Sequence, residues 1–385
     1  MTAHDAITAF ADELTAIRQD LHENPELGFE EVRTSGIVAD KLKEWGVDQL
    51  ETGIGKTGVV AVIKGNRPGR RIGLRADMDA LPIHEQTNLP YASKTPGVMH
   101  ACGHDSHTTM LLGAARYLSE NRDFAGEAVL IFQPAEEGLG GARAMLADGL
   151  FDRFPVDEVY GMHNSPFDDP GVIAVKPGPA MAGANFFDIK VTGIGGHAAR
   201  PEGTVDALVV AAGLAREMHT IVSRNVSPND QIVLSVTQLH AGAAYNVIPE
   251  EATLAGTVRY FSREAADLVT ERMQAICDGY AKTHGAQIEL DMRNVFDVLE
   301  NDEALSEGMI DAARTLVGEQ AKHRDERVMG SEDFADMLAV VPGAYCTIGH
   351  KGDVPLHNPG FVFDDEALPT GAALMATIVE RRGAA

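Results

Sequence analysis

The chain of 385 residues has few cysteines, no long apolar run and a deficit of basic residues. An odd and sparse set of three cysteines (Cys102, Cys277 and Cys346) excludes a fold held together by disulfide bonds. No apolar stretch approaches the roughly 20 residues that span a bilayer, which excludes a transmembrane helix. The first residues lack the basic and apolar regions of a secretion signal. We therefore expect a cytoplasmic protein with no membrane partner.

The charge balance is strongly acidic, because 57 Asp and Glu residues outnumber 32 Lys and Arg residues. The formal net charge is -25. A protein that binds nucleic acid carries a basic patch that neutralises phosphates. The composition therefore argues against a nucleic-acid partner, and we interpret the acidic excess as a solvated surface.

Strand-like and helix-like patterns alternate along the first part of the chain, beginning with a predicted helix over residues 6–21. This alternation predicts an α/β domain whose sheet is mixed and largely parallel. Between residues 181 and 291 the order becomes strand–helix–strand–strand–helix–strand, which is typical of a small, ferredoxin-like α+β module. We therefore predict a catalytic domain formed by 1–180 and 292–385, split by an inserted domain at 181–291.

Two adjacent carboxylates, Glu136 and Glu137, follow the apolar run 128–132, and Pro134 and Gly138 surround them. The short apolar run is typical of a buried strand. Two negative charges at the end of such a strand cost desolvation free energy unless a cation compensates them. A metal ion can take one carboxylate as a ligand and leave its neighbour to transfer protons, as metal-assisted hydrolysis requires.

Other residues of the types that bind metals lie near the ends of predicted strands or helices: Asp77, Cys102, His104, His163 and His357. In an open α/β sheet, ligands gather at the carboxyl ends of the strands. The mixture of sulfur, nitrogen and oxygen donors suits zinc, manganese, nickel or cobalt better than magnesium or calcium. The spacing alone is equally compatible with polar loop histidines and with an aspartate that caps a helix.

Eight segments, which follow one another along nearly the whole chain, carry a family resemblance: Gly73–Pro82, Met99–Asp105, Gln133–Glu137, Gly161–His163, Gly195–Ala199, Asn246–Pro249, Gly330–Phe334 and His357–Pro359. Through them the chain resembles the amidohydrolase branch of the dinuclear metallopeptidase family. That branch contains aminoacylases, hippurate hydrolases, indoleacetyl-amino-acid hydrolases and N-acetyl-diaminopimelate deacetylases.

The resemblance implies two divalent metal ions held by one thiolate, three imidazoles and one carboxylate: Cys102, His104, His163, His357 and Glu137. Cys102 would take the place of the aspartate that bridges the ions in the peptidase relatives. Asp77 would stand behind the ligands and either orient one of them or fix the charge of the site. Arg75 occupies the position where those peptidases have another metal-binding histidine.

The resemblance also implies roles in a reaction. Glu136 would take a proton from the attacking water and pass it to the leaving amine. His197, on the inserted domain, would reach the site of a neighbouring subunit and stabilise the oxyanion. Asn246 and Arg259 would bind the α-carboxylate of the substrate, the guanidinium through two hydrogen bonds. The inserted domain would serve dimerisation or act as a lid, in a homodimer or homotetramer.

The leading interpretation is an enzyme that hydrolyses small N-acyl amino acids to a carboxylate and a free amino acid. A dipeptidase or carboxypeptidase of the same fold is the alternative among enzymes. A metal-free binding protein is the alternative in another class, and the complete set of carboxylates and histidines argues against it.

Overall fold

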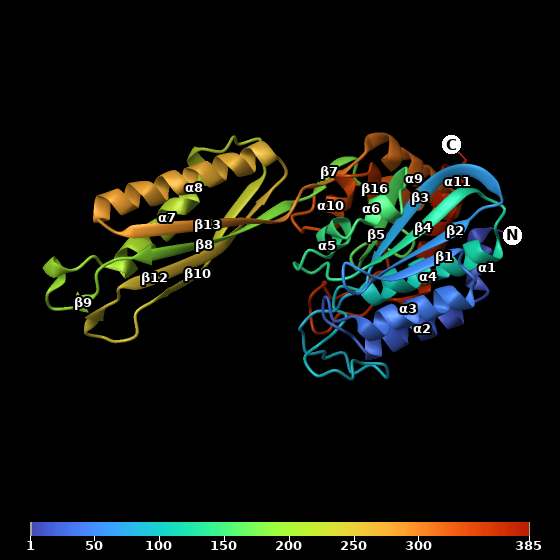
Figure 1. Cartoon of the computed structure of the whole chain (residues 1–385), viewed down its shortest axis with the longest axis horizontal. Helices are drawn as coiled ribbons and strands as arrows, with labels where there is room; N and C mark the ends of the chain where they lie inside the picture. The colour runs from blue at the N-terminus through green and yellow to red at the C-terminus, as the bar shows by residue number, and fades with distance from the viewer. Residues whose placement is uncertain (1, 385) are drawn as a thin grey trace. The chain divides into compact units, whose positions relative to one another are not determined.

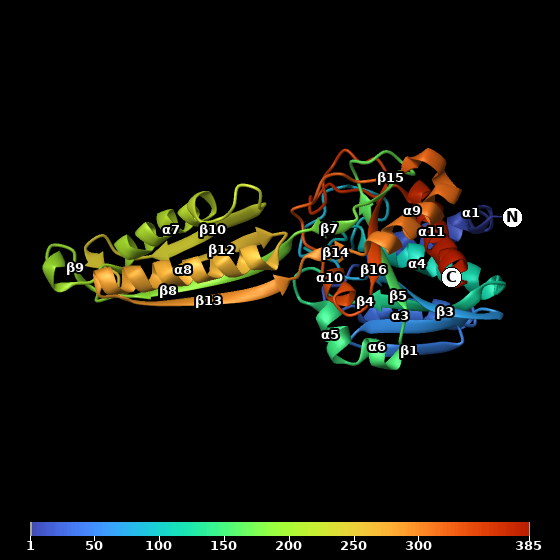
Figure 2. The same ribbon diagram turned by 90° about the horizontal axis from the view of Figure 1, so that it is seen from above.

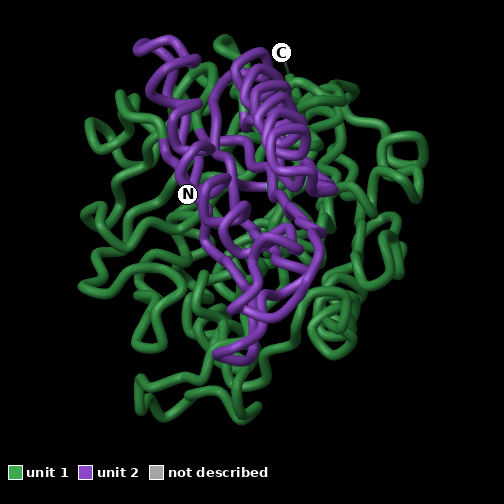
Figure 3. The backbone as a smooth tube through the Cα atoms, turned by 90° about the vertical axis from the view of Figure 1, so that its left-hand side faces the viewer, with its two compact units in different colours: residues 1–180, 300–327, 333–385 green, residues 181–299, 328–332 purple. Residues whose placement is uncertain are grey.

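The structure is a computed structural model that describes residues 2–384 and divides into two compact units, which Figure 1 shows as ribbons and Figure 3 distinguishes by colour. Unit 1 comprises Met1–Ala180, Glu300–Arg327 and Asp333–Ala385, and unit 2 comprises Met181–Leu299 and Val328–Glu332. Positions 1 and 385, the outer ends of the predicted catalytic domain, lie outside the described residues. Unit 2 extends past the predicted boundary at 291, because strand β13 continues to Phe296.

The main sheet of unit 1 has eight strands in the order β1-β2-β4-β3-β5-β16-β6-β15. The strands are β1 Gln49–Ile54, β2 Gly58–Lys64, β3 Arg67–Asp77, β4 Ala125–Gln133, β5 Glu158–Ser165, β6 Ile173–Val175, β15 Ala321–His323 and β16 Gly343–Gly349. The central strands β4, β3, β5 and β16 are parallel to their neighbours within this group. At the flanks, β1 and β2 are antiparallel, and β6 is antiparallel to β16. This mixed and largely parallel sheet confirms the predicted α/β class.

Helices and the sheet of unit 1 enclose one large apolar core. The helices are α1 Ala3–Thr8, α2 Ala11–Glu23, α3 Val32–Glu44, α4 His104–Glu120, α5 Gly141–Ala147, α6 Leu150–Arg153, α9 Glu303–Val317, α10 Phe334–Leu338 and α11 Leu368–Arg382. In the central strand β4 every residue except Glu127 is buried, because helices cover both faces of a parallel sheet. The apolar run in β4 therefore packs on both sides and brings Gln133 to the edge of the sheet.

The predicted single helix over 6–21 is wrong, because the structure has two helices, α1 and α2, in its place. Phe10 interrupts the helix with φ of -124° and ψ of 24°. The guanidinium of Arg116 lies 4.2 Å from the centre of the Phe10 ring. This tertiary contact with α4, which apolar spacing does not reveal, accompanies the break.

Unit 2 has a four-stranded antiparallel sheet in the order β10-β12-β8-β13. Its elements are β8 Gly183–Thr192, α7 Ala207–Arg224, β10 Ile232–Ala241, β12 Glu251–Tyr260, α8 Arg263–His284 and β13 Gln287–Phe296. Figure 2 shows α7 and α8 lying together on one face of this sheet. Burial alternates along β8, as expected when one face packs and the other meets solvent. The element order confirms the predicted α+β module.

The remaining short strands are β7 Gly178–Met181, β9 Gly196–His197, β11 Val247–Ile248 and β14 Leu299–Asn301. Within residues 2–384, no helix combines the length and the apolar character needed to cross a membrane.

Candidate metal centre

The carboxyl ends of three neighbouring parallel strands bring polar side chains to one edge of the main sheet in unit 1. β3 ends at Asp77, which pairs in register with Gln133, the last residue of β4. His163 lies near the end of β5, which pairs in parallel with β3. Helix α4 begins at His104, directly after Gly103, whose φ of 83° suits glycine. This edge is the place where ligands bind in open α/β sheets.

The five predicted metal ligands form two groups of donor atoms that share Cys102. One group contains Cys102, His104 and His163, and the other contains Cys102, Glu137 and His357. In each group the donor atoms lie within 4.8 Å of one another. Cys102 Sγ is 3.3 Å from His163 Nε2, and His357 Nε2 is 3.2 Å from Glu137 Oε1. The structure therefore brings all five side chains together.

Hydrogen bonds orient two histidines at this edge for metal binding. His104 Nδ1 lies 3.1 Å from Asp79 Oδ1, and His163 Nδ1 lies 2.7 Å from the carbonyl oxygen of Asn164. Since a carboxylate and a carbonyl only accept hydrogen bonds, each Nδ1 carries a proton, which leaves Nε2 as the nitrogen that can bind an ion. Burial alone would lower the pKa of His104, but the charge of Asp77 raises it well above its ordinary value, so His104 Nε2 binds an ion only after losing a proton. His104 Nε2 is buried and has no hydrogen-bond partner among the residues that the structure describes. A buried nitrogen without a partner is costly, and a metal ion would satisfy it.

The electrostatics of Cys102 and His163 also fit a bound cation. Burial and the nearby Glu137 carboxylate raise the pKa of the Cys102 thiol. Burial lowers the pKa of His163 to about 3, so this ring stays neutral. Metal ions bind thiolates and neutral imidazoles. His163 is thus ready to bind an ion, whereas Cys102 needs a nearby cation to stabilise its thiolate.

Asp79 connects two of the predicted ligands, but it was not predicted as a site residue from the sequence. Its Oδ1 accepts the hydrogen bond from His104, and its Oδ2 accepts one from the Glu137 backbone N–H at 3.0 Å. We expected Asp77 to orient a ligand or to fix the charge of the site. Its Oδ2 is 3.9 Å from His104 Nε2, and its Oδ1 lies 2.6 Å from His107 Nδ1. Residues two apart along an extended chain face the same side, so the spacing of the two aspartates was the available signal.

Arg75 provides a fixed positive charge behind the ligands. Its side chain is fully buried, and it donates to Asp77 Oδ2 at 2.7 Å, to Gln133 Oε1 at 2.8 Å and to Asp333 Oδ1 at 3.0 Å. Burial alone would raise the pKa of Asp77, but the charges of His104 and Arg75 hold it well below its ordinary value. The arginine therefore bonds to the carboxylates of Asp77 and Asp333 and helps to keep Asp77 ionised.

Glu136 lies beside the ligands but belongs to neither of the groups that contain Cys102. One of its carboxylate oxygens lies within 4.8 Å of donor atoms of His104 and Glu137, and its side chain is buried. The turn between β4 and α5 carries it. A carboxylate placed beside metal ligands, while others supply the ligand atoms, suits proton transfer.

The other predicted site residues lie in unit 2, where His197 and Asn246 are close together. His197 pairs with Val247 across β9 and β11, and the Ala198 N–H donates to the Asn246 carbonyl oxygen at 3.0 Å. The Ala199 N–H donates to His197 Nδ1 at 3.1 Å. In the neutral ring the proton is therefore on Nε2, which can donate a hydrogen bond to an oxyanion.

Arg259 lies toward the other end of the sheet of unit 2. β12 begins at Glu251, opposite Thr192, the residue from which the chain continues to β9. Arg259 is opposite Ala184, and the strand between Glu251 and Arg259 is about 26 Å long. The arginine is half-buried, and burial lowers its pKa. Within unit 2 of a single chain, Arg259 therefore lies far from His197 and Asn246.

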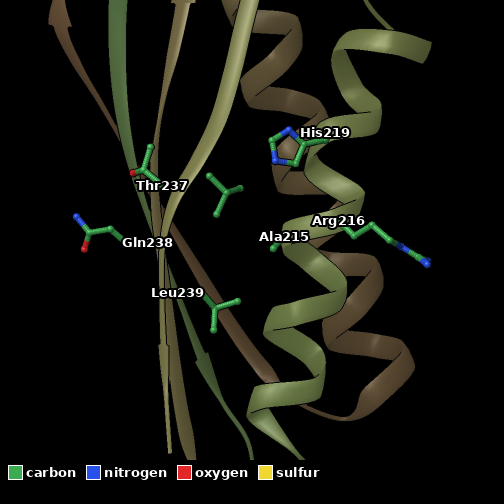
Figure 4. A pocket seen from close by; sticks show the side chains of 7 residues that line it. Ala215, Arg216, His219, Thr237, Gln238 and Leu239 are labelled. Carbon is green, nitrogen blue, oxygen red and sulfur yellow. The ribbon is translucent and has the colours of Figure 1, made fainter.

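A cavity of about 440 Å³ lies between α7 and β10 in unit 2. Figure 4 shows its lining, with His219 and Arg216 on the helix and Thr237, Gln238 and Leu239 on the strand. None of the predicted site residues lines this cavity, and no carboxylate or thiol does so. Its lining therefore shares no residue with the candidate metal centre.

A split α/β unit, with thiolate, imidazole and carboxylate donors beside a further carboxylate at its sheet edge, defines the class of metal-dependent hydrolases. Residues 73–381 match the family described as Peptidase family M20/M25/M40. The chain belongs to this family.

Named relatives are similar over nearly the whole chain. Hippurate hydrolase of Campylobacter jejuni is 44% identical over 367 residues, with 95% of each chain covered. N-acetylcysteine deacetylase of Bacillus subtilis is 41% identical over 371 residues, covering 96% of this chain and 97% of the relative. Thermostable carboxypeptidase 2 of Saccharolobus solfataricus is 37% identical over 377 residues, covering 95% and 94%.

Among solved structures, the YXEP protein of Bacillus subtilis, described as a dinuclear metal binding peptidase from the M20 family, is similar throughout. It has a TM-score of 0.85 and 37% sequence identity, with 97% of this chain and 98% of the other covered.

Proposed function

We propose that this protein hydrolyses the amide bond of N-acyl amino acids and releases a carboxylate and a free amino acid. The observation that carries the proposal is the sheet edge at which Glu136 lies beside two donor groups that share Cys102. The names of two relatives, hippurate hydrolase and N-acetylcysteine deacetylase, support the substrate class. We therefore expect small N-acyl amino acids to be the substrates that this protein binds.

Two divalent ions, of zinc, manganese, nickel or cobalt, are the proposed cofactors. His104 and His163 would serve one ion, Glu137 and His357 the other, and Cys102 both. Bound there, the ions would supply Lewis-acid polarisation of the amide carbonyl and of water. His104 Nε2, which is buried without a hydrogen bond among the described residues, supports this assignment, as does the similarity to a dinuclear metal binding peptidase.

Glu136 would move the proton during hydrolysis. Its carboxylate accepts a proton from the attacking water and delivers it to the nitrogen of the leaving amine, which makes the amine a better leaving group. Its buried position beside Glu137 excludes bulk water from this transfer. His197 Nε2–H donates to the carbonyl oxygen as negative charge develops there.

A second copy of the chain would complete the site. Asn246 and His197 lie at one end of the sheet of unit 2, whereas Arg259 lies about 26 Å along β12. One small substrate can contact all three residues only if two subunits supply them. This geometry supports a homodimer, or a homotetramer built from such dimers, that assembles through the inserted unit. Three free cysteines support a reducing, cytoplasmic location.

A substrate panel tests the proposed reaction. Metal-loaded enzyme is given N-acetyl and N-benzoyl amino acids and the matching unblocked dipeptides, and kcat/KM is measured for each. We expect the best N-acyl amino acid to exceed its dipeptide counterpart by about a hundredfold, because a site shaped for an uncharged acyl group leaves an ammonium group unpaired. Faster cleavage of the unblocked dipeptides would contradict the proposal.

A carboxypeptidase is the second candidate, since thermostable carboxypeptidase 2 is among the similar proteins. Both reactions use a substrate with a free α-carboxylate. Peptides of three residues with a blocked amino end separate them, because a carboxypeptidase releases their last residue and an enzyme limited to N-acyl amino acids does not.

A further inference from the structure

Three buried carboxylates hold the main chain of the turn that carries Glu136 and Glu137. The turn spans residues 134–142, and we call it the 134–142 turn. Backbone N–H groups at its beginning, middle and end donate to side chains from three distant segments. The pairs are Ala135 with Glu31 Oε1 at 2.8 Å, Glu137 with Asp79 Oδ2 at 3.0 Å and Ala142 with Asp333 Oδ2 at 2.9 Å.

Ala135, which directly precedes Glu136, has an unfavourable backbone conformation. Its φ is 54°, in the left-handed region where the Cβ of a residue other than glycine meets the backbone. Residues in such conformations persist only where their surroundings hold them, and they gather at functional sites. The direction in which Glu136 leaves the turn depends on this φ.

The segment that contains Glu31 packs directly against Ala135. A Cβ added at Gly28 would lie 3.0 Å from both Cα and Cβ of Ala135, so this close approach needs glycine. Glu31 is fully buried, and its second oxygen accepts a hydrogen bond from the Thr57 hydroxyl at 2.6 Å. It has no ion-pair partner among the described residues. Burying a carboxylate without a counter-ion costs free energy of folding. Packing alone would not require a carboxylate at this position.

We propose that Glu31 is a positioning residue for catalysis, which holds Ala135 in its left-handed conformation and thereby fixes the direction of Glu136. The inference rests on the proposed function, in which Glu136 transfers the proton. Glu31 can be tested more cleanly than Asp79 or Asp333, because Asp79 also contacts His104 and Asp333 also contacts Arg75. The Glu31 carboxylate accepts hydrogen bonds from the Ala135 N–H and the Thr57 hydroxyl, and neither residue is a predicted metal ligand.

The experiment compares Glu31→Met, which has no strong acceptor, with Glu31→Gln, which keeps an oxygen that accepts from Ala135. Each change is also made together with Ala135→Gly, because glycine adopts a positive φ without strain. The matched control is Glu30→Met, which removes an exposed carboxylate next in the chain. For each variant, kcat and KM are measured on the best N-acyl amino acid, and the metal content per chain is measured by elemental analysis.

We expect Glu31→Met to lower kcat about 10- to 100-fold, as a small displacement of a catalytic group does, while KM and metal content stay within about twofold. Glu31→Gln keeps kcat within about threefold, because the acceptor remains. Ala135→Gly recovers about fivefold in the Glu31→Met background, because the left-handed conformation no longer needs support. Glu30→Met has no effect.

An unchanged kcat in Glu31→Met overturns the inference. A change in KM or in metal content of more than about twofold also overturns it, and so does a loss of kcat that Ala135→Gly does not reduce. If Glu31→Met does not fold, Glu31→Asp withdraws the oxygen by one methylene and provides the same comparison. A wild-type enzyme inactive on every N-acyl amino acid would overturn the proposed function. An active wild type with an unaffected Glu31→Met overturns this inference alone.

Discussion

Glu136 and Glu137 are neighbours in the chain, yet their different contacts indicate different roles. Glu137 shares a donor group with Cys102 and His357, and its backbone N–H is fixed by Asp79. Glu136 lies next to these atoms without joining either group that contains Cys102. One side chain can therefore bind an ion while the other transfers a proton, which is the division of labour that amide hydrolysis needs.

This division predicts opposite outcomes for two adjacent substitutions. Glu136→Gln should lower kcat about a thousandfold, because the amide cannot accept the proton, and it should leave the metal content unchanged. Glu137→Gln should lower the affinity for one ion, because a neutral amide is a weaker ligand than a carboxylate. Elemental analysis and turnover of the same samples check both. A Glu136→Gln enzyme that retains full turnover would remove Glu136 from the mechanism.

At the scale of elements, the start of β5 is anchored far from the candidate metal centre by a buried carboxylate. Glu158 accepts hydrogen bonds from Tyr160 at 2.7 Å and from Arg382 of α11 at 2.6 and 2.9 Å, and it pairs with Arg70 of β3 at 2.6 Å. Burial alone would raise the pKa of Glu158, but the bonds from Arg382 and Tyr160 lower it. The cluster ties the last helix to two central strands.

The lowered pKa of Glu158 predicts how this anchor depends on pH. Since the pKa is lower in the folded than in the unfolded protein, the carboxylate stabilises the fold above pH 4.5, and the contribution is lost as the pH falls through the folded value. Glu158→Gln should lower the free energy of unfolding by about 2 kcal/mol at pH 7, and by less below pH 4.

Urea unfolding of the wild type and Glu158→Gln between pH 3 and pH 7 measures this difference. The control is Glu127→Gln, whose half-exposed pair with Arg71 should contribute less than about 0.5 kcal/mol. A difference between the wild type and Glu158→Gln that stays constant over this pH range would contradict the account of the anchor.

Long periodic elements could be predicted from the sequence, whereas short strands and the supports of the site could not. Helix α8 and strand β12 carry enough regular spacing to reveal their type and ends. β1 is short and contains polar residues and a glycine, and β16 is a short run between two glycines. Such short segments become strands only through their neighbours in the sheet.

At the candidate site, the potential ligands could be selected because cysteine, histidine and glutamate are recognisable by type and by family resemblance. The residues that hold these ligands and Glu136 in place could not be predicted in the same way. Glu31 acts on the backbone of Ala135, which lies 104 residues further along the chain, and no local pattern encodes that contact. Asp79 differs from Asp77 only in its tertiary contacts.

At the scale of the whole molecule, the positions of His197, Asn246 and Arg259 within unit 2 lead to a proposal about assembly. If His197 serves the site of a neighbouring subunit, the metal centre and its oxyanion donor belong to different chains. A symmetric dimer then contains two composite sites, each built from both copies.

Mixing two inactive variants tests this sharing. In a heterodimer of Glu136→Gln and His197→Ala subunits, one of the two sites receives an intact Glu136 and an intact His197. After subunit exchange at equal amounts, we expect about a quarter of the wild-type turnover, since half of the dimers are mixed and each has one intact site. Activity that does not exceed the sum of the separate variants would show that His197 does not act across subunits.

The central claim is that hydrolysis of N-acyl amino acids depends on metal ions bound by the two donor groups that share Cys102. The most direct measurement is the rate of N-benzoylglycine hydrolysis by chelator-treated enzyme as manganese or zinc is added back, with Cys102→Ala and Cys346→Ala titrated in parallel. The account predicts that activity rises with bound metal up to two ions per chain, that Cys102→Ala fails to recover, and that Cys346→Ala, which loses a buried thiol of the same unit, recovers. Metal-free enzyme as fast as the loaded form, or full recovery of Cys102→Ala, would contradict it.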